Sequence, residues 1–372
     1  AGTAWAVAAP ESAEGGVEEL PTDDGPLRVR TKGRVVAVGD LHGDLAQAHK
    51  TLELAGVLGW SDDGAPEWIG GDTVLVQVGD LLDRGDEEIA ILLLLRRLGD
   101  TASASGGAVY ILNGNHEVLN VSGDFRYVTM GAFQESAAVA ARLSGEGTEG
   151  WDGDREGWER ALRLRLSLFA PGGPVARQLA RNPTVLMVND TVFAHGGLTP
   201  EQVNYGLGKL NQTVSDWMLG AIGEELAALE GSKQDAEQQW ENAAKGGEES
   251  AAEANSSESL KKSAREQEIA QALDLAVGNG DSIVWNRTYS TEEFRNDKER
   301  SSACDQLKET LSLIPGAKRL VVGHTPQMQG CNAECDGSIW RIDAGISRGV
   351  LGAAPQVLVI DGDTVDVLAA EE

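Results

Sequence analysis

The stretch Arg34-Val35-Val36-Ala37-Val38-Gly39-Asp40-Leu41-His42-Gly43 joins an apolar, β-branched run to a glycine and then to a carboxylate and an imidazole. The same pattern follows twice more: residues 73–78 lead into Gly79-Asp80-Leu81-Leu82-Asp83-Arg84-Gly85, and residues 108–112 are followed by Gly114-Asn115-His116-Glu117. A short apolar run that stops at a glycine is typical of a buried strand. The sequence therefore predicts three strands with polar side chains at their carboxyl ends.

Helical patterns separate these strands. Asp44 is placed to cap a helix that we expect to end near Gly59, and Asp86 to cap a helix over 87–98, with a polar loop over 61–71 between them. The order β-α-β-α-β with short connections predicts a parallel sheet with right-handed crossovers. Because ligands bind such sheets at the carboxyl ends of the strands, the three polar segments should share one crevice.

The second half of the chain predicts a further sheet. After a mostly helical region over 122–180, the expected elements are a hairpin over 185–195, strands over 320–322 and 339–342, and a hairpin over 357–368. The two halves together predict an α/β fold in which a mixed sheet faces the first one. We expect residues 1–27 to be a flexible acidic segment and residues 28–372 to form one domain. Within it, residues 219–280 are rich in Glu, Ala, Gln, Ser and Lys, which predicts a solvated helical or disordered insertion, with a regulatory arm as the alternative.

The amino-acid composition and net charge exclude some classes of binding partner. The 372 residues carry a formal net charge of −28, and 41% of them are hydrophobic, so the chain is globular and strongly acidic. Nucleic acid and anionic membranes would repel it, and no apolar run is long enough to predict a membrane span. Three cysteines, Cys304, Cys331 and Cys335, make an odd number. We expect free thiols in a reducing compartment, with a redox-switched Cys331–Cys335 pair as the alternative, and no zinc site, because a second cysteine pair is missing.

Histidines give the sharpest indication of chemistry. Of the five, His49 lies within a helical pattern and looks incidental, whereas His42, His116, His195 and His324 follow strands or sit beside glycines. Divalent first-row metals accept mixed carboxylate and imidazole ligands, and two ions can share a bridging carboxylate. Asp40 and His42 are placed to hold one ion and Asp80 to bridge. The remaining candidate ligands, for a second ion, are Asn115, His195 and His324.

The motifs GD-x-HG, GD-x-x-DRG and GNHE, in this order, resemble those of the phosphoprotein phosphatases within the calcineurin-like metallophosphoesterases. The stretches 72–93, 123–128, 194–198 and 322–326 resemble the Shewanella-like phosphatases, in particular their plant and algal plastid branch. The likeness covers roughly residues 28–370, apart from the acidic insertion and parts of 140–165. It implies a β-sandwich of two mixed sheets flanked by helices, and a chloroplast location.

The resemblance also implies roles for the site residues. Asp40, His42 and Asp80 would bind one metal, and Asp80, Asn115, His195 and His324 the other, with manganese expected and iron or zinc as alternatives. Asp83 would orient His116 as the general acid, while Arg84 and Arg287 would hold the phosphoryl oxygens. Two cations lower the pKa of a bridging water, so that hydroxide attacks phosphorus in one step without a phospho-enzyme.

The expected activity is that of a serine/threonine phosphoprotein phosphatase. The alternatives are a bis(5′-nucleosyl)-tetraphosphatase, a phosphotyrosine-preferring phosphatase and an inactive phosphatase fold that acts as a binding module. Residues 342–347, Ile-Asp-Ala-Gly-Ile-Ser, stand where the commoner eukaryotic branch has a Ser-Ala-Pro-Asn-Tyr-Cys loop. This departure argues against inhibition by toxins that engage that loop and against use of that branch's regulatory subunits, and it leaves the regulatory subunits unknown. We expect a mainly structural role for Asp343, whereas Arg126 is equally consistent with the substrate cleft and with packing.

Overall fold

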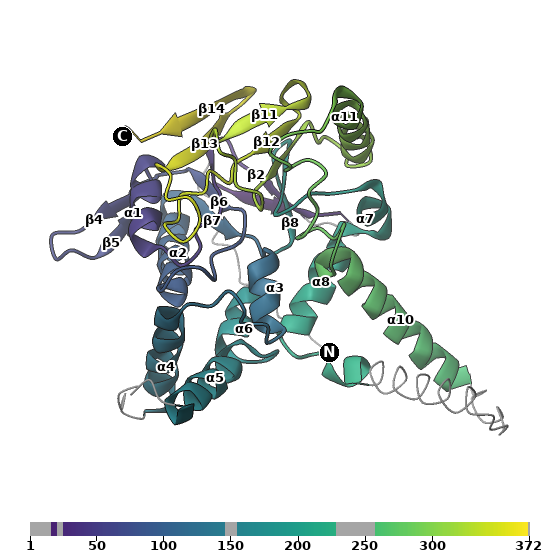
Figure 1. The fold of residues 1–372 in the computed structure, drawn as a ribbon. Helices are drawn as coiled ribbons and strands as arrows, with labels where there is room; N and C mark the ends of the chain where they lie inside the picture. The colour runs from purple at the N-terminus through teal and green to yellow at the C-terminus, as the bar shows by residue number, and fades with distance from the viewer. Residues whose placement is uncertain (1–15, 21–24, 146–154, 228–256, 371–372) are drawn as a thin grey trace.

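The computed structural model describes residues 16–20, 25–145, 155–227 and 257–370 (Figure 1). Its strands are β1 (Glu18–Leu20), β2 (Leu27–Arg30), β3 (Val35–Val38), β4 (Leu58–Trp60), β5 (Pro66–Trp68), β6 (Val74–Gln77), β7 (Ala108–Ile111), β8 (Val185–Val188), β9 (Thr191–Ala194), β10 (Arg319–Val322), β11 (Asn332–Glu334), β12 (Ile339–Arg341), β13 (Gln356–Asp361) and β14 (Thr364–Ala369). Its helices are α1 (Leu45–Leu54), α2 (Glu88–Ala102), α3 (Asn115–Val121), α4 (Met130–Ser144), α5 (Arg155–Phe169), α6 (Pro174–Leu179), α7 (Pro200–Tyr205), α8 (Leu207–Met218), α10 (Ser257–Val277) and α11 (Asp297–Ser312), with short 3₁₀ turns η1 (Ser103–Ser105) and η2 (Cys335–Gly337).

Two mixed sheets form the centre of the molecule. One has the strand order β14-β13-β3-β6-β7, in which β3, β6 and β7 are parallel and β13 is antiparallel to β3. The other has the order β1-β2-β8-β9-β10-β12-β11, with β9, β10 and β12 parallel. The parallel core of the first sheet and the hairpin β8–β9 were both expected from the sequence.

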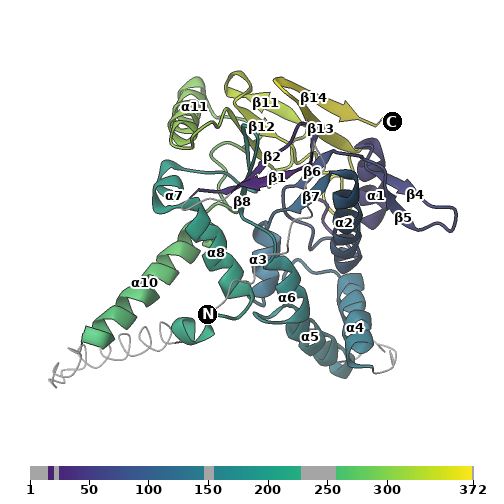
Figure 2. The same ribbon diagram turned by 180° about the vertical axis from the view of Figure 1, so that it is seen from behind.

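The sheets pack face to face because alternate strand residues from both point inward. A buried apolar cluster contains Val35, Ala37, Val74 and Val76 of the first sheet together with Phe193 and other residues of the second. Their neighbours along the strands point outward, so that Val36 and Leu75 pack with residues of α1 and α2. The sandwich flanked by helices confirms the expected α/β class (Figures 1 and 2).

Local boundaries differ from the sequence expectation around α1 and α2. Helix α1 ends at Leu54, well before Gly59, because Gly56 takes a left-handed conformation (φ 68°) and residues 58–60 form β4, which pairs with β5 of the expected polar loop. The cap of α2 is Glu87, not Asp86. The carboxylate of Asp86 instead accepts a hydrogen bond from the Thr129 hydroxyl (2.6 Å), which draws it away from the helix end.

Two segments expected to lie outside the fold make packed structure where they are described. Strand β1 pairs with β2, so ordered structure begins before Leu27. Residues 228–256 of the expected insertion lie outside the described residues, but α10 at its carboxyl end packs Ile269, Ala272 and Ala276 into the core. These three apolar residues share one helix face, a spacing that the average composition of the segment conceals. No helix in the described ranges is long and apolar enough to cross a membrane.

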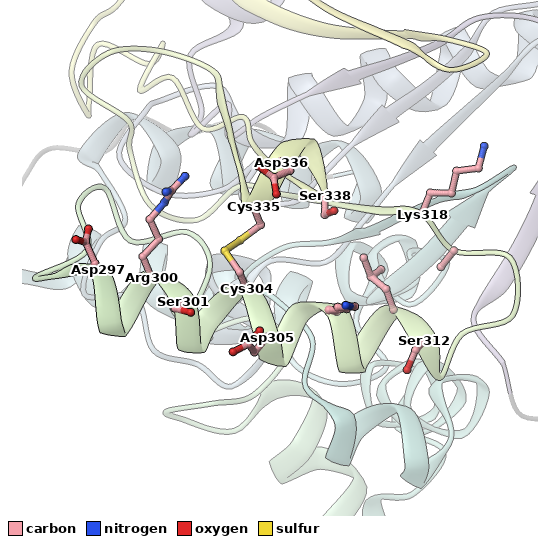
Figure 3. Close-up of a pocket in the computed structure, with 13 residues that line it drawn as sticks. Asp297, Arg300, Ser301, Cys304, Asp305, Ser312, Lys318, Cys335, Asp336 and Ser338 are labelled. Carbon is pink, nitrogen blue, oxygen red and sulfur yellow. A yellow bond between two sulfur atoms is a disulfide. The ribbon is translucent and has the colours of Figure 1, made fainter.

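The expectation of three free thiols is wrong for Cys304 and Cys335. Cys304 of α11 and Cys335 of η2 form a disulfide, with Cα atoms 5.3 Å apart, while Cys331 is a free thiol. The chain turns Cys335 toward α11 through left-handed conformations at Cys335 and Asp336 (φ 50° and 55°). Cys331 points inward instead, where its thiol donates to the carbonyl oxygen of Ile342 and burial raises its pKa to about 12. The disulfide lines a surface pocket of about 730 Å³ between α11 and η2, and Figure 3 shows it joining these two elements.

Because of this disulfide, we expect the free energy of unfolding to depend on whether the protein is oxidised or reduced. It closes a sequence separation of 31 residues, so reduction should lower the free energy of unfolding by about 3–4 kcal/mol through the added entropy of the unfolded chain. Urea unfolding with and without dithiothreitol measures this difference. The double variant Cys304→Ser/Cys335→Ser is the control and should be insensitive to reductant. Equal midpoints for the wild type under both conditions would contradict the assignment.

Candidate metal centre and active site

The candidate residues meet where strands of both sheets end. Asp40 follows β3, Asp80 follows β6 and Asn115 follows β7, while His195 and His324 follow β9 and β10 of the second sheet. All five are buried. The strand ends expected to share one crevice therefore do meet, and the facing sheet supplies the two distant histidines.

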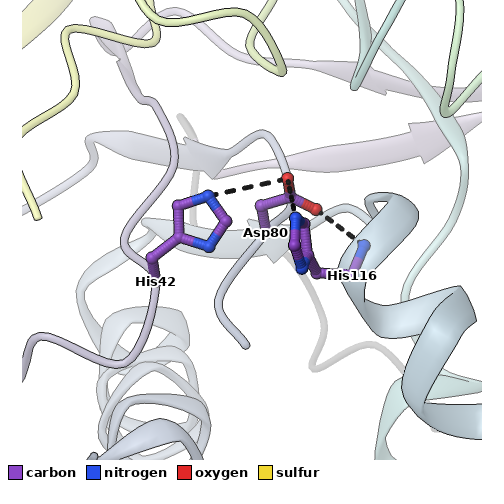
Figure 4. A group of neighbouring side chains, drawn as sticks. All are labelled: His42, Asp80 and His116. Atoms are coloured by element: carbon purple, nitrogen blue, oxygen red, sulfur yellow. Dashed lines mark hydrogen bonds and ion pairs between the residues drawn. The ribbon is translucent and has the colours of Figure 1, made fainter. Parts of the chain in front are cut away.

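The carboxylate of Asp80 is the centre of this group. Its Oδ2 lies 3.1 Å from Nε2 of His195, 3.8 Å from Nε2 of His42 and 3.9 Å from Nε2 of His116. Figure 4 shows His42 and His116 reaching Asp80 from separate segments, with the backbone nitrogen of His116 also donating to Oδ1 (3.0 Å). Two groups of potential ligands share this carboxylate: His42, Asp80 and His116, and Asp80, His195 and His324.

Backbone carbonyls orient two of the imidazoles. Nδ1 of His42 lies 2.9 Å from the carbonyl oxygen of Leu82, and Nδ1 of His195 lies 2.9 Å from that of Val78. A proton on each Nδ1 satisfies these contacts and leaves Nε2 as the ring nitrogen that faces Asp80. This use of the second ring nitrogen is the usual support for histidines that ligate metals.

The other expected ligands occupy the same buried region. The side-chain oxygen of Asn115 lies 3.0 Å from Nε2 of His195 and 2.8 Å from Nδ1 of His324. Asp40 accepts from the backbone nitrogen of His324 (3.1 Å) and shares a side-chain hydrogen bond with Asp343. Asp40 lies outside both three-residue groups, and His116 lies beside His42 and Asp80 in one of them.

Charge is distributed unevenly among these buried groups. Burial would raise the pKa of Asp80, but His195 and His116 outweigh it and hold that pKa well below its ordinary value. Burial and the neighbouring Asp343 raise the pKa of Asp40. Burial lowers the pKa of His42 to about 4, so its imidazole is neutral at physiological pH and can donate an electron pair to a metal.

His116 and Asp83 form a separate pair beside this cluster. Nδ1 of His116 lies 2.5 Å from Oδ2 of Asp83, and both side chains are buried. Burial lowers the pKa of His116, but the carboxylates of Asp80 and Asp83 outweigh that effect and raise it. The pair therefore favours a protonated imidazole held in one orientation, which is the arrangement that a general acid needs.

The backbone around the site is held in unusual conformations. Non-glycine residues with left-handed φ values include His42 (43°), Asp80 (56°), Asp83 (68°), Arg84 (66°) and His324 (71°). Such conformations cost free energy and cluster at functional sites. Glycines make the close approach possible: a Cβ atom on Gly114 would lie 2.2 Å from Oδ1 of Asp80, and one on Gly79 would lie 2.7 Å from the backbone nitrogen of Gly114.

Glu117 is a residue whose role the sequence expectation missed. It is fully buried, and its carboxylate accepts from the backbone nitrogens of Gly114 (2.7 Å), Asp80 (2.8 Å), Leu81 (2.9 Å) and Leu82 (3.2 Å). These bonds fix the turn that carries Asp80. Its place in Gly114-Asn115-His116-Glu117 was the available signal, but its partners in that turn lie 35 to 37 positions away.

Two arginines and a tyrosine lie at the rim. Arg84 is exposed, and its guanidinium carbon lies 5.2 Å from the ring centre of Tyr127, which is 40% exposed and itself 5.2 Å from the ring centre of His116. Arg287 lies in a segment without regular secondary structure and donates to the hydroxyl of Thr325 (3.0 Å), next to His324. Both guanidinium groups lie close enough to the cluster to lower histidine pKa values.

Two other residues singled out in the sequence lie apart from the cluster. Arg126 is exposed and pairs with Asp124, and His49 of α1 packs edge-on against Trp60.

The donor set fits divalent metal ions. The carboxylate of Asp80, the amide oxygen of Asn115 and several histidine imidazoles converge in one buried place. This is the mixture of ligands that first-row metals accept. Nε2 of His324 is buried without a hydrogen-bond partner. A buried polar nitrogen of this kind is costly unless a further group engages it.

Replacing Glu117 tests how the turn is held. Glu117→Gln exchanges one acceptor oxygen for an NH₂ group that faces backbone N–H groups, so we expect the free energy of unfolding to fall by about 2–3 kcal/mol. Urea unfolding measures the change. Glu67→Gln, which alters an exposed glutamate of β5, is the matched control and should change stability little. Equal effects of the two substitutions would show that Glu117 does not support the turn.

Comparison with known proteins identifies the family. A model of the calcineurin-like phosphoesterases matches residues 33–328. The chain is 34% identical over 351 residues to Shewanella-like protein phosphatase 2 of Arabidopsis thaliana, covering 89% of this chain and 76% of that protein. It is 29% identical over 171 residues to Shewanella-like protein phosphatase 1 of Plasmodium berghei, covering 46% and 40% of the two chains.

Among solved structures, the fold is similar to a cold-active protein-tyrosine phosphatase of a psychrophilic Shewanella, with a TM-score of 0.59, 20% identity, and coverage of 93% of this chain and 82% of that one. The chain therefore belongs to the calcineurin-like phosphoesterases, is a Shewanella-like protein phosphatase homologue, and is a hydrolase.

Proposed function

We propose that this hydrolase is a metal-dependent serine/threonine phosphoprotein phosphatase that cleaves phosphomonoesters in one step. The arrangement around Asp80 carries the proposal. One buried carboxylate faces imidazoles from separate strand ends, and His116, paired with Asp83 through Nδ1, turns its Nε2 toward the same place. Metal ligands and a candidate proton donor thus adjoin one another.

We further propose the following division of roles. Asp40, His42 and Asp80 hold one divalent ion, and Asp80, Asn115, His195 and His324 hold the other, with manganese expected and iron or zinc as alternatives. Bound ions would supply an activated water and positive charge opposite the phosphoryl oxygens. His116 keeps a proton on Nε2 for the leaving alkoxide, and Arg84 and Arg287 hold the phosphoryl oxygens from the rim. A chloroplast location is also proposed, supported by the resemblance to the plastid branch alone.

Phosphotyrosine is the second candidate substrate, and one observation favours it. The half-exposed ring of Tyr127 stands beside His116 and under the guanidinium of Arg84. An aryl leaving group would pack against this ring as it departs toward His116.

A comparison of substrates under defined metals tests the proposed activity. With added Mn²⁺, we expect kcat/KM to be highest for phosphoserine and phosphothreonine peptides, lower for a matched phosphotyrosine peptide and lowest for diadenosine tetraphosphate. Chelation should abolish hydrolysis, and Mn²⁺ should restore it. Preference for the phosphotyrosine peptide or for diadenosine tetraphosphate would replace the proposed substrate class, and full activity after chelation would reject the metal requirement.

Two substitutions separate the metal ligands from the proton donor. Asp80→Asn should lose both bound metal and activity, because Asp80 is the carboxylate that both groups share. His116→Asn should keep most of the metal and lose about 100-fold or more in kcat, which is the usual contribution of general acid–base catalysis. Metal analysis of the purified variants, together with kcat on a phosphoserine peptide, measures both effects. Similar metal loss in both variants would contradict the division of roles.

A further inference from the structure

Helix α5 places an arginine in the interior close to the proposed proton donor. Arg165 has no exposed surface, and its guanidinium carbon lies 4.4 Å from the ring centre of Phe169, 5.4 Å from that of Phe125 and 5.6 Å from that of Phe133. Burying a guanidinium among aromatic rings is costly unless its donors are satisfied. Its polar partners are therefore informative.

Those partners lead toward the active site. Nε and Nη2 of Arg165 both donate to Oδ1 of Asn120 (3.1 and 2.6 Å), Nη1 donates to the hydroxyl of Ser136 (3.0 Å), and Nη2 lies 2.7 Å from Oε2 of Glu88 in an ion pair. Because the arginine occupies the oxygen of Asn120, the amide nitrogen must face the other way.

On that other side is Asp83. Nδ2 of Asn120 donates to Oδ1 of Asp83 (3.0 Å) and to the carbonyl oxygen of His116 (2.9 Å). Oδ2 of Asp83 meets Nδ1 of His116, and the backbone nitrogen of Asp83 donates to Oε1 of Glu88 (2.6 Å). Arg165 is therefore connected to the side chain of Asp83 through Asn120 and to the backbone nitrogen of Asp83 through Glu88.

We propose that Arg165 is a positioning residue for the departure of the leaving group. By fixing the amide of Asn120 and the carboxylate of Glu88, it holds Asp83, and through Asp83 the ring of His116, in the orientation that delivers a proton. This inference rests on the proposed role of His116 and extends it to α5, which touches neither the metal ligands nor the rim arginines through any of these bonds. The pair of helices α4 and α5 that projects from the sandwich in Figure 1 is thus joined to the site through one buried side chain.

A positioning role and a purely structural role of Arg165 predict different effects on two kinds of substrate. An alkoxide leaving group, as in a phosphoserine peptide, needs a proton as the bond breaks, whereas p-nitrophenolate leaves as a stable anion. A misplaced His116 should therefore slow alkyl ester hydrolysis selectively. Loss of packing alone should reduce both activities by a similar factor.

The test uses the double variant Glu88→Gln/Arg165→Met in the full chain with Mn²⁺. It removes both buried charges together, which proteins tolerate better than removal of one partner, and the amide introduced at position 88 keeps an oxygen for the backbone of Asp83. We expect kcat for the phosphoserine peptide to fall about 10–100-fold, which is typical of lost supporting hydrogen bonds. We expect kcat for p-nitrophenyl phosphate to fall less than about threefold, because this substrate needs little proton donation. KM and the amount of bound metal should stay unchanged.

Leu168→Ala is the matched control, because Leu168 is a buried residue of the same helix outside the hydrogen-bonded set. It should lower the unfolding midpoint and leave the ratio of the two kcat values unchanged. If the double variant does not fold, Asn120→Asp takes its place. That substitution preserves size and the contact with Arg165 but removes the donor to Asp83, so the same change of ratio is expected.

The outcomes are separable. A wild-type protein that hydrolyses neither substrate would reject the proposed function itself. A wild type that hydrolyses both, with the kcat ratio unaltered in the folded variant, would overturn only the role of Arg165. A change of ratio in Leu168→Ala as large as that in the variant would also overturn it, because packing would then account for the effect.

Discussion

The carboxylate of Asp80 is buried where the strands of two sheets end, and its negative charge has to be stabilised there. The imidazoles of His195 and His116 do so from one side. The carboxylate of Glu117 accepts hydrogen bonds from the backbone N–H groups of the turn that carries Asp80. Because Asp80 adopts a left-handed conformation against Gly114, neither a bulkier neighbour nor a relaxed turn would keep this carboxylate in place.

The same carboxylate separates two kinds of chemistry. The side toward His195, Asn115 and His324 has the donor atoms of a metal site and is enclosed by both sheets. The side toward His116 and Asp83 holds an imidazole whose neighbours favour its protonated form. The proposed proton donor and a proposed metal ligand are adjacent because α3 begins shortly after β7, so that Asn115 and His116 are consecutive residues facing different partners.

Support for the proton-donating side comes from outside the sandwich. Asp83 is held through Asn120 and Glu88 by Arg165, whose own burial depends on the aromatic residues of α4 and α5. The packing of α5 and the geometry of His116 are therefore linked by one buried ion pair. A buried pair of this kind adds little net stability but fixes orientation strongly, since each unpaired charge would be costly.

Sequence patterns predicted the strands of the parallel core and the polar residues that follow them, because strand periodicity and glycine placement act over short distances. They also indicated a second mixed sheet, but the hairpin β13–β14 expected in that sheet joins the first one, where β13 pairs with β3. Tertiary structure decided which groups touch. Asn115 and His324 are 209 positions apart, Arg165 and Asn120 are 45 apart, and Cys335 pairs with Cys304 instead of the nearer Cys331. Such pairings depend on how helices and sheets pack and which way each side chain turns, and no local pattern in the sequence records either.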